Sequence, residues 1–144
     1  MTMIPADERL TRLLLETRVI AMVGASLKPA RPSHGVGEYM AASGYRVIPV
    51  NPGHAGKTLF GETVVASLAD IDVPVDMLNI FRRSDQIAPV VEEGLAALPG
   101  LKSVWMQLGL SNVEGRAMAE AKGLTVVEDR CLLIEHRRLI RGRY

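Results

Sequence analysis

The chain has 144 residues, of which 48% are hydrophobic and 23% are charged, and its formal net charge is +1. This composition excludes a disordered chain, and the near-neutral charge gives no general attraction to nucleic acid or membrane surfaces. The one cysteine excludes an internal disulfide and the N-terminal stretch lacks a signal-peptide pattern, so we expect a single cytoplasmic domain over residues 1–144.

Strand-like and helix-like segments alternate along the chain. The predicted strands are short, continuous apolar runs, as expected when both faces of a sheet are covered. They span residues 19–23, 45–50, 75–81, 103–106 and 124–127. The predicted helices show apolar residues at helical spacing. They are a leading helix carrying Leu10, Leu13 and Leu14, then residues 34–43, 84–98, 111–122 and 131–139.

Local signals mark several boundaries of these elements. Ser111 and Glu114 have the spacing of a capping box, which predicts Ser111 as a helix N-cap. Gly44 and Gly123 each fit the position just after a helix end. Residues 55–63 are either a loop or a short extended piece, and residues 65–71 hold one or two helical turns.

The alternation of strands and helices predicts an α/β fold. We expect a Rossmann-like, doubly wound, mainly parallel sheet of about five strands with helices on both faces. Ligands of such sheets bind beyond the carboxyl ends of the strands, where the strand order reverses. The candidate strand ends are residues 24–26, 51–52, 81–83, 107–109 and 129–131.

The end of the first predicted strand is the most informative of these. Gly24 opens a loop of small and cationic residues that leads into a helix, where free N–H groups and the helix dipole favour an anion. Lys28 and Arg31 lie on this loop, and Arg82 and Arg83 follow the third strand. A solvated Arg pair is the simpler alternative, but cations before a helix N-terminus are unfavourable unless an anion is near. These loops therefore predict a phosphate-bearing ligand.

A dinucleotide such as NAD fits this loop less well. After Gly24 the next glycine is Gly35, so the loop is longer than the G-x-G-x-x-G turn. The second strand ends on Asn51 and Pro52 rather than on a carboxylate that would bind a ribose hydroxyl. An ordinary NAD dehydrogenase is therefore disfavoured.

Signals for catalysis and metal binding are weak. His34, His54 and His136 have no Ser or Cys nucleophile at a recognisable spacing, and we expect His136 at the surface or in a subunit contact. No Cys/His or acidic cluster has the spacing of metal ligands. Cys131 is either a packed small side chain or a thiolate activated by a helix N-terminus.

Six short motifs occur in order along residues 10–140. They are Gly24-Ala25-Ser26, Arg31-Pro32-Ser33, Val47-Ile48-Pro49-Val50-Asn51-Pro52, Phe81-Arg82-Arg83, Val104-Trp105-Met106-Gln107-Leu108-Gly109 and Glu128-Asp129-Arg130-Cys131. Together they resemble the small stand-alone CoA-binding domain proteins, which are similar to the N-terminal domain of the succinyl-CoA synthetase α subunit. The resemblance implies a Rossmann-like fold that binds coenzyme A or acyl-CoA across the strand ends.

The resemblance also implies where CoA would lie. The first loop would approach the diphosphate and its cations would pair with phosphates, while the second strand end would border the adenosine. The third strand end would frame the cleft, and the loop after the fourth strand adds two further residues. In chain order the candidate residues are Gly24, Ala25, Ser26, Lys28, Arg31, Ser33, Asn51, Pro52, Phe81, Arg82, Arg83, Gln107 and Gly109.

The function that these observations favour is non-catalytic binding of CoA or acyl-CoA, for regulation, storage or delivery. The alternatives are a partner-dependent component of an acyl-CoA ligase, a small NAD(P)-linked oxidoreductase, and an interaction module with a vestigial pocket. The expected partner is a nucleotide-bearing small molecule rather than nucleic acid or membrane, and a homodimer is one option for self-association. A thiolate at Cys131 would form a mixed disulfide with the CoA thiol.

Overall fold

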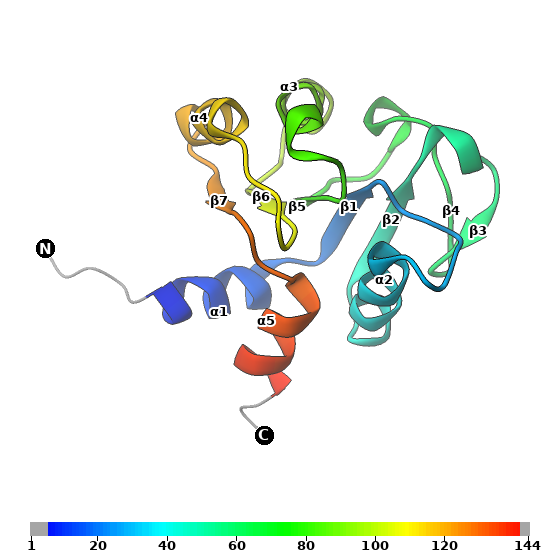
Figure 1. Ribbon diagram of the computed structural model, residues 1–144, viewed down its shortest axis with the longest axis horizontal. Helices are drawn as coiled ribbons and strands as arrows, with labels where there is room; N and C mark the ends of the chain where they lie inside the picture. Colours follow the sequence, from blue (N-terminus) through cyan, green and yellow to red (C-terminus); the bar gives the residue numbers. More distant parts are fainter. Residues whose placement is uncertain (1–5, 142–144) are drawn as a thin grey trace, which may run out of the picture.

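The computed structural model describes residues 6–141 (Figure 1). Its helices and strands alternate as the sequence predicts. The helices are α1 (Ala6–Glu16), α2 (Pro32–Ala42), α3 (Ile87–Ala97), α4 (Val113–Ala121) and α5 (Leu132–Leu139). The strands are β1 (Val19–Val23), β2 (Arg46–Val50), β3 (Thr58–Leu59), β4 (Glu62–Thr63), β5 (Met77–Ile80), β6 (Ser103–Met106) and β7 (Thr125–Val127).

The predicted parallel sheet is confirmed. Its order is β2-β1-β5-β6-β7, and every neighbouring pair is parallel. The chain moves outward from β1 to β2 and then returns to β5 on the other side of β1. The order therefore reverses between β1 and β5, which is where a doubly wound sheet opens a crevice at the carboxyl ends of its strands.

Helices cover both faces of this sheet, which confirms the doubly wound fold. Helices α1, α2 and α5 lie on one face, and α3 and α4 lie on the other (Figure 1). Alternate residues of β1 supply the two layers, because successive side chains of a strand point to opposite faces. Ile20 and Met22 join the layer under α1, α2 and α5, while Ala21 and Val23 join the layer under α3 and α4.

Several boundaries differ from the sequence prediction. Helix α2 begins at Pro32 rather than near His34, because proline is tolerated in the first turn. The predicted capping box is wrong: Asn112, not Ser111, is the N-cap of α4, and its side chain accepts a hydrogen bond from the N–H of Gly115. The third strand is shorter than predicted, and the terminal helix begins one residue later than predicted, at Leu132.

The segment that the sequence left ambiguous, residues 55–63, contains the hairpin of β3 and β4. Phe60, at its turn, has a φ of 56° and packs over Gly37 of α2, where an added Cβ would overlap the phenyl ring. A glycine on the helix thus leaves a slot for the aromatic ring. This contact fixes the hairpin against α2, beside the carboxyl end of β2.

His136 is buried, so its predicted surface position is wrong. Its side chain is 4% exposed, and its Nδ1 lies 3.0 Å from the hydroxyl of Tyr39 on α2. Its ring meets the ring of Tyr45 edge-on, and the Tyr45 hydroxyl donates to the Leu14 carbonyl of α1. Arg137 and Arg138, which follow His136 in sequence, are exposed, while the helix turns His136 inward. The imidazole therefore lies where α1, α2 and α5 meet.

We expect His136 to make the stability of the protein depend on pH. Burial lowers the pKa of His136 from its ordinary value of 6.5, and the charge of Arg141 lowers it further. The imidazole of His136 therefore binds a proton more weakly in the folded chain than in the unfolded chain. As the pH drops below about 6.5, protonation favours the unfolded chain and the free energy of unfolding falls. Above that pH the contribution of His136 is fully present. Urea unfolding measured at a series of pH values gives this slope.

The matched variants for this test are His136→Gln and His54→Gln. His136→Gln should flatten the dependence of stability on pH, whereas His54→Gln should keep the slope of the parent protein. Parallel curves for His136→Gln and the parent would show that the buried imidazole does not control this dependence.

The described helices contain no segment long and apolar enough to cross a bilayer.

Candidate functional site

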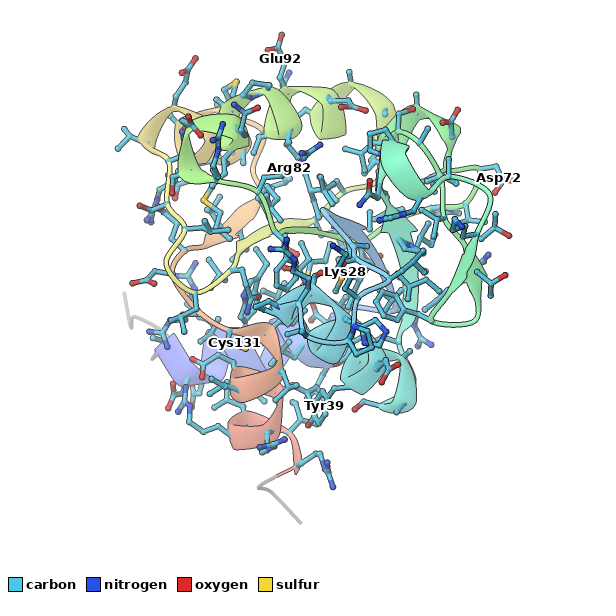
Figure 2. All side chains as sticks on the ribbon, turned by 45° about the vertical axis from the view of Figure 1, so that its right-hand side comes forward. Lys28, Tyr39, Asp72, Arg82, Glu92 and Cys131 are labelled. Atoms are coloured by element: carbon cyan, nitrogen blue, oxygen red, sulfur yellow. The ribbon has the colours of Figure 1, made fainter. Side chains whose placement is uncertain are left out.

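A pocket of about 380 Å³ lies at the carboxyl ends of β1, β2 and β5, where the strand order reverses. It is bounded on one side by the loop between β1 and α2, and on the other by the residues that follow β5. Figure 2 shows two cations of the pocket, Lys28 and Arg82, at this end of the sheet. Its lining residues are Gly24, Ser26, Lys28, Arg31, Pro32, Ser33, Asn51, His54, Phe81 and Arg82.

The structure brings most of the sequence-predicted site residues together at this pocket. Those that line it are Gly24, Ser26, Lys28, Arg31, Ser33, Asn51, Phe81 and Arg82. The predicted residues that do not line it are Ala25, Pro52, Arg83, Gln107 and Gly109. Two lining residues, Pro32 and His54, were not among the predicted ones. Pro32 stands inside one of the quoted motifs, whereas nothing in the sequence around His54 marks it as a pocket residue.

Gly24 lets two strand ends approach each other. Its φ is +88°, and a Cβ there would lie 2.3 Å from the Phe81 carbonyl oxygen. The N–H of Gly24 donates to the Val50 carbonyl of β2. A glycine is required because any side chain would meet the backbone after β5 and would also need a left-handed conformation. Gly24 thus joins the ends of β1, β2 and β5 at the floor of the pocket.

The N-terminus of α2 lies at this loop, where Pro32 has no N–H and the N–H of His34 donates to the Arg31 carbonyl, whereas the N–H of Ser33 has no backbone acceptor in the described structure. Arg31 is its N-cap residue and makes no side-chain capping hydrogen bond, and Pro32 is the first helical residue. In α4, by contrast, Asn112 caps the first turn. The first turn of α2 thus has no side-chain acceptor from its N-cap. Free N–H groups together with the helix dipole form a site that favours an anion.

The charges around the pocket have one sign. None of its lining residues is acidic. Lys28, Arg31 and Arg82 are exposed, and within residues 6–141 none of them has a carboxylate within 4 Å. Arg83 differs, because its Nε lies 3.4 Å from Asp85. The predicted pair therefore separates: Arg82 lines the pocket and Arg83 pairs with a surface carboxylate.

Asn51 ties the two strand-end loops together. Its Nδ2 donates to the Ala25 carbonyl at 2.7 Å, and its Oδ1 accepts from the N–H of Gly53 at 2.9 Å. A carboxylate at this position could not donate to a carbonyl oxygen. Ala25 is 1% exposed and contributes this carbonyl rather than a pocket surface, because its side chain packs into the core. The amide of Asn51 therefore has a structural task that an acidic residue could not perform.

The predicted residues on the loop after β6 lie outside the pocket. Gln107 is buried, and its Oε1 accepts from the N–H of Leu132 at the start of α5. The N–H of Gly109 donates to Asp129 at 2.6 Å. Both residues support the loops around α5. Cys131 is the half-buried N-cap of α5, packs against the core and does not line the pocket.

The arrangement suits the binding of phosphates. Arg side chains offer paired N–H donors to phosphate oxygens, Lys offers a point charge, and the loop and helix offer backbone N–H groups. The lining includes no carboxylate and no cysteine. Within the described part of the chain, no group of three His, Cys, Asp or Glu side chains is placed to hold a metal ion.

Comparison with known proteins identifies relatives of this chain. A family model described as "CoA binding domain" matches residues 18–137. YneT of Bacillus subtilis (strain 168) is 39% identical over 132 residues, which cover 92% of this chain and 95% of YneT. The solved structure of cell-free ID.343 from Thermus thermophilus is 41% identical with a TM-score of 0.89, covering 94% of this chain and 100% of that one.

The fold also matches part of a larger enzyme. This is the dinucleotide-forming acetyl-coenzyme A synthetase 1 of Ca. Korarchaeum cryptofilum, solved in complex with phosphate and ADP. The identity is 24% and the TM-score 0.64, and the match covers 81% of this chain but 26% of the synthetase chain. At this identity the likeness concerns the fold alone.

Proposed function

Because this chain belongs to the CoA-binding domain family, we propose that the pocket at the ends of β1, β2 and β5 binds coenzyme A or an acyl-CoA. The observation that carries the proposal is the set of cations that have no acidic partner among residues 6–141 and lie around a helix N-terminus without a side-chain cap. CoA presents a diphosphate and a further phosphate to such a site.

In this proposal the diphosphate lies over Gly24 and Ser26, close to the first turn of α2. Backbone N–H groups then donate to its oxygens, and the α2 dipole stabilises the negative charge. Arg31 and Arg82 approach from opposite loops and donate paired hydrogen bonds to phosphates. Lys28 adds a third positive charge.

We propose that the protein captures and releases its ligand without transforming it. Anion-binding groups dominate the lining of the pocket, and Lys28 and His54 are the lining residues of types that can act as general bases. No cysteine or carboxylate stands beside His54 in that lining. Such a protein would regulate, store or deliver CoA or acyl-CoA.

The end of β2 favours CoA over NAD. Dinucleotide sites place an acidic residue there to accept hydrogen bonds from the ribose. Asn51 occupies that position, and both polar atoms of its amide already bond to the backbone. The pocket thus lacks the acceptor that a dinucleotide ribose needs, while its cations match the additional phosphate of CoA.

A thermal-unfolding panel with CoA, acetyl-CoA, NAD, NADP and ATP tests the proposal. A ligand present at 100 times its Kd stabilises the fold by about 2.7 kcal/mol, which raises the Tm of a chain of this size by roughly 8 °C. We expect this shift with CoA or acetyl-CoA and a much smaller one with NAD. Stabilisation by NAD and not by either CoA compound would refute the proposal.

A further inference from the structure

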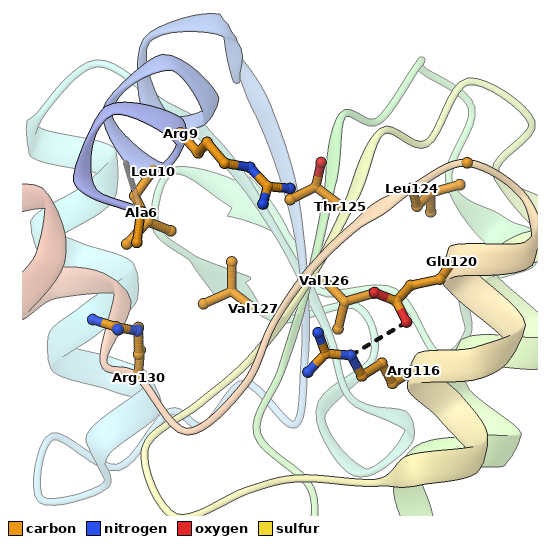
Figure 3. A pocket seen from close by; sticks show the side chains of 11 residues that line it. Ala6, Arg9, Leu10, Arg116, Glu120, Leu124, Thr125, Val126, Val127 and Arg130 are labelled. Atoms are coloured by element: carbon orange, nitrogen blue, oxygen red, sulfur yellow. Dashed lines mark hydrogen bonds and ion pairs between the residues drawn. The ribbon is translucent and has the colours of Figure 1, made fainter. Parts of the chain in front are cut away.

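The described structure has a second pocket, which is larger than that of the proposed CoA site. It measures about 480 Å³ and lies along β7, at the other edge of the sheet from β2 (Figure 3). Its floor is the segment from Gly123 to Val127, one wall is α1 and the other is α4. We call this hollow the β7 groove.

The floor of the β7 groove is an unpaired strand edge. Strand β7 ends the sheet, and its one neighbour is β6. The N–H of Thr125 donates to the Lys102 carbonyl, so Thr125 faces β6. Alternate residues of a parallel strand bond to opposite sides, and Val126 therefore turns its N–H and C=O towards the groove. Leu124, Thr125 and Val126 are half-buried, whereas all of β5 and β6 is buried.

The two walls of the groove differ in charge, and the α1 wall is the positive one. Arg9 extends from α1 towards Thr125, and Arg116 extends from α4 over β7 (Figure 3). Arg116 pairs with two carboxylates, Glu120 and Glu128, so this side of the groove offers no free positive charge. Arg9 and its neighbour Arg12, which lines an adjoining hollow, have no carboxylate within 4 Å among residues 6–141. The α1 wall therefore offers two cations with no acidic partner in the described structure.

We propose that the β7 groove binds an extended acidic segment of a partner protein, which adds to the sheet as a strand beside β7. Main-chain hydrogen bonds to Val126 would hold the segment, as in other cases of strand addition. Acidic side chains on alternate residues of the segment would face Arg9 and Arg12. This surface is separate from the proposed CoA pocket, and the inference does not depend on that function.

The chemistry of the floor selects a peptide over a small anion. Val126 presents one donor and one acceptor side by side, a pattern that the backbone of an extended peptide repeats, whereas the oxygens of a phosphate act chiefly as acceptors. The shape of the groove argues against a second copy of the chain pairing edge to edge. The β7 edge lies at the bottom of the groove with α1 and α4 on either side, so these helices stand between two such edges.

The test is a titration of the isotopically labelled full chain with two synthetic heptapeptides, followed by amide chemical shifts. One heptapeptide alternates glutamate with valine, and the other alternates lysine with valine. We expect the acidic peptide to shift the amides of residues 123–127 and of α1, and the lysine peptide to leave them unchanged. Inorganic phosphate is titrated in parallel.

Two variants separate the backbone and charge contributions. Val126→Pro removes the outward N–H, which is the substitution that an edge strand tolerates, and should weaken binding by about 10-fold. Because this proline can also disturb the strand, the double variant Arg9→Glu with Arg12→Glu gives an independent measurement and should abolish the preference for the acidic peptide. Arg83→Ala, on the far loop after β5, is the matched control and should bind normally.

Three outcomes overturn the inference. The first is the absence of shifts at the groove with the acidic peptide at millimolar concentration. The second is equal shifts with both peptides, which would mean that Arg9 and Arg12 do not select the charge. The third is a response to phosphate that matches the response to the peptide, which would identify a small-anion site instead of a strand-binding groove.

Discussion

Replacing Arg31 and Arg82 together by Ala should weaken CoA binding by at least about 100-fold, because each charge-assisted hydrogen bond contributes roughly 1.5–3 kcal/mol. The two residues reach the pocket from different loops, the N-cap of α2 and the segment after β5. Neither has an acidic partner within 4 Å among the described residues, so their removal leaves no carboxylate unpaired. The fold should therefore keep its stability while the ligand loses its phosphate contacts.

Isothermal titration calorimetry at several salt concentrations measures this effect. The dependence of the affinity on salt should also become weaker in the double variant, because fewer charges attract the phosphates. Arg83→Ala is the control, since Arg83 is the neighbour of Arg82 but pairs with Asp85 outside the pocket. We expect its affinity to stay within about 3-fold of the parent protein, because surface ion pairs contribute little. Equal losses in both variants would contradict the assignment of the pocket.

The second large effect is expected for Gly24→Ala. A Cβ at this position lies 2.3 Å from the Phe81 carbonyl oxygen and 3.0 Å from its carbon, and the φ of +88° is unfavourable for alanine. The clash is with backbone, which cannot rotate away as a side chain would. Strain and overpacking together should destabilise the fold by about 3–4 kcal/mol, lowering the Tm by roughly 10 °C. Chemical and thermal unfolding give both values.

Gly109→Ala separates these two causes. Gly109 has a φ of +84°, close to that of Gly24, but an added Cβ there meets nothing within 4 Å. This variant therefore tests the conformational cost alone, which should be about 1–2 kcal/mol. If both variants lose the same stability, the close approach of β1 and β5 at Gly24 is not what demands glycine. CoA affinity should fall in Gly24→Ala and stay unchanged in Gly109→Ala.

Most of the fold could be predicted from local patterns. Continuous apolar runs such as residues 19–23 indicate strands buried on both faces, and the helical segments between them require parallel crossovers. The five parallel strands and both helical layers follow from this reasoning. The capping box was misplaced because Ser111 and Asn112 are both good N-caps. Asn112 is the N-cap in the structure, and its Nδ2 also donates a hydrogen bond to the Ser84 carbonyl on a different loop.

The candidate site was harder to predict, because local sequence patterns do not determine the order of the strands in the sheet. Strand β6 lies beyond β5, away from β1 and β2, so the loop after β6 does not border the pocket. Gln107 and Gly109 were expected in the site from the family resemblance, and in the structure they do not line this pocket. Arg82 and Arg83 illustrate a second limit. Neighbouring side chains of an extended segment point in opposite directions, and a sequence pattern does not tell which of them faces the pocket.

The sequence pattern of α5 also did not predict that Glu135 and His136 are buried. Glu135 is 5% exposed and accepts hydrogen bonds from Arg130 and Arg138. Burial tends to raise the pKa of Glu135, but the hydrogen bonds from these two arginines outweigh it and hold that pKa below its ordinary range. In the sequence, residues 135–138 are a charged run typical of a solvated face. Arg138 and His136 also have partners on distant segments, Asp7 and Tyr39, and only the folded chain brings these together.

The junction of α1, α2 and α5 around His136 has a consequence for the order of events during synthesis. Helices α1 and α2 emerge from the ribosome well before α5, yet both dock on it. Until α5 arrives, the apolar side of β1, including Ile20 and Met22, lacks part of its cover. Contacts between segments so far apart in the chain form late and slowly. The nascent chain therefore exposes this face while it is being translated, and molecular chaperones have their best opportunity to bind it in that interval.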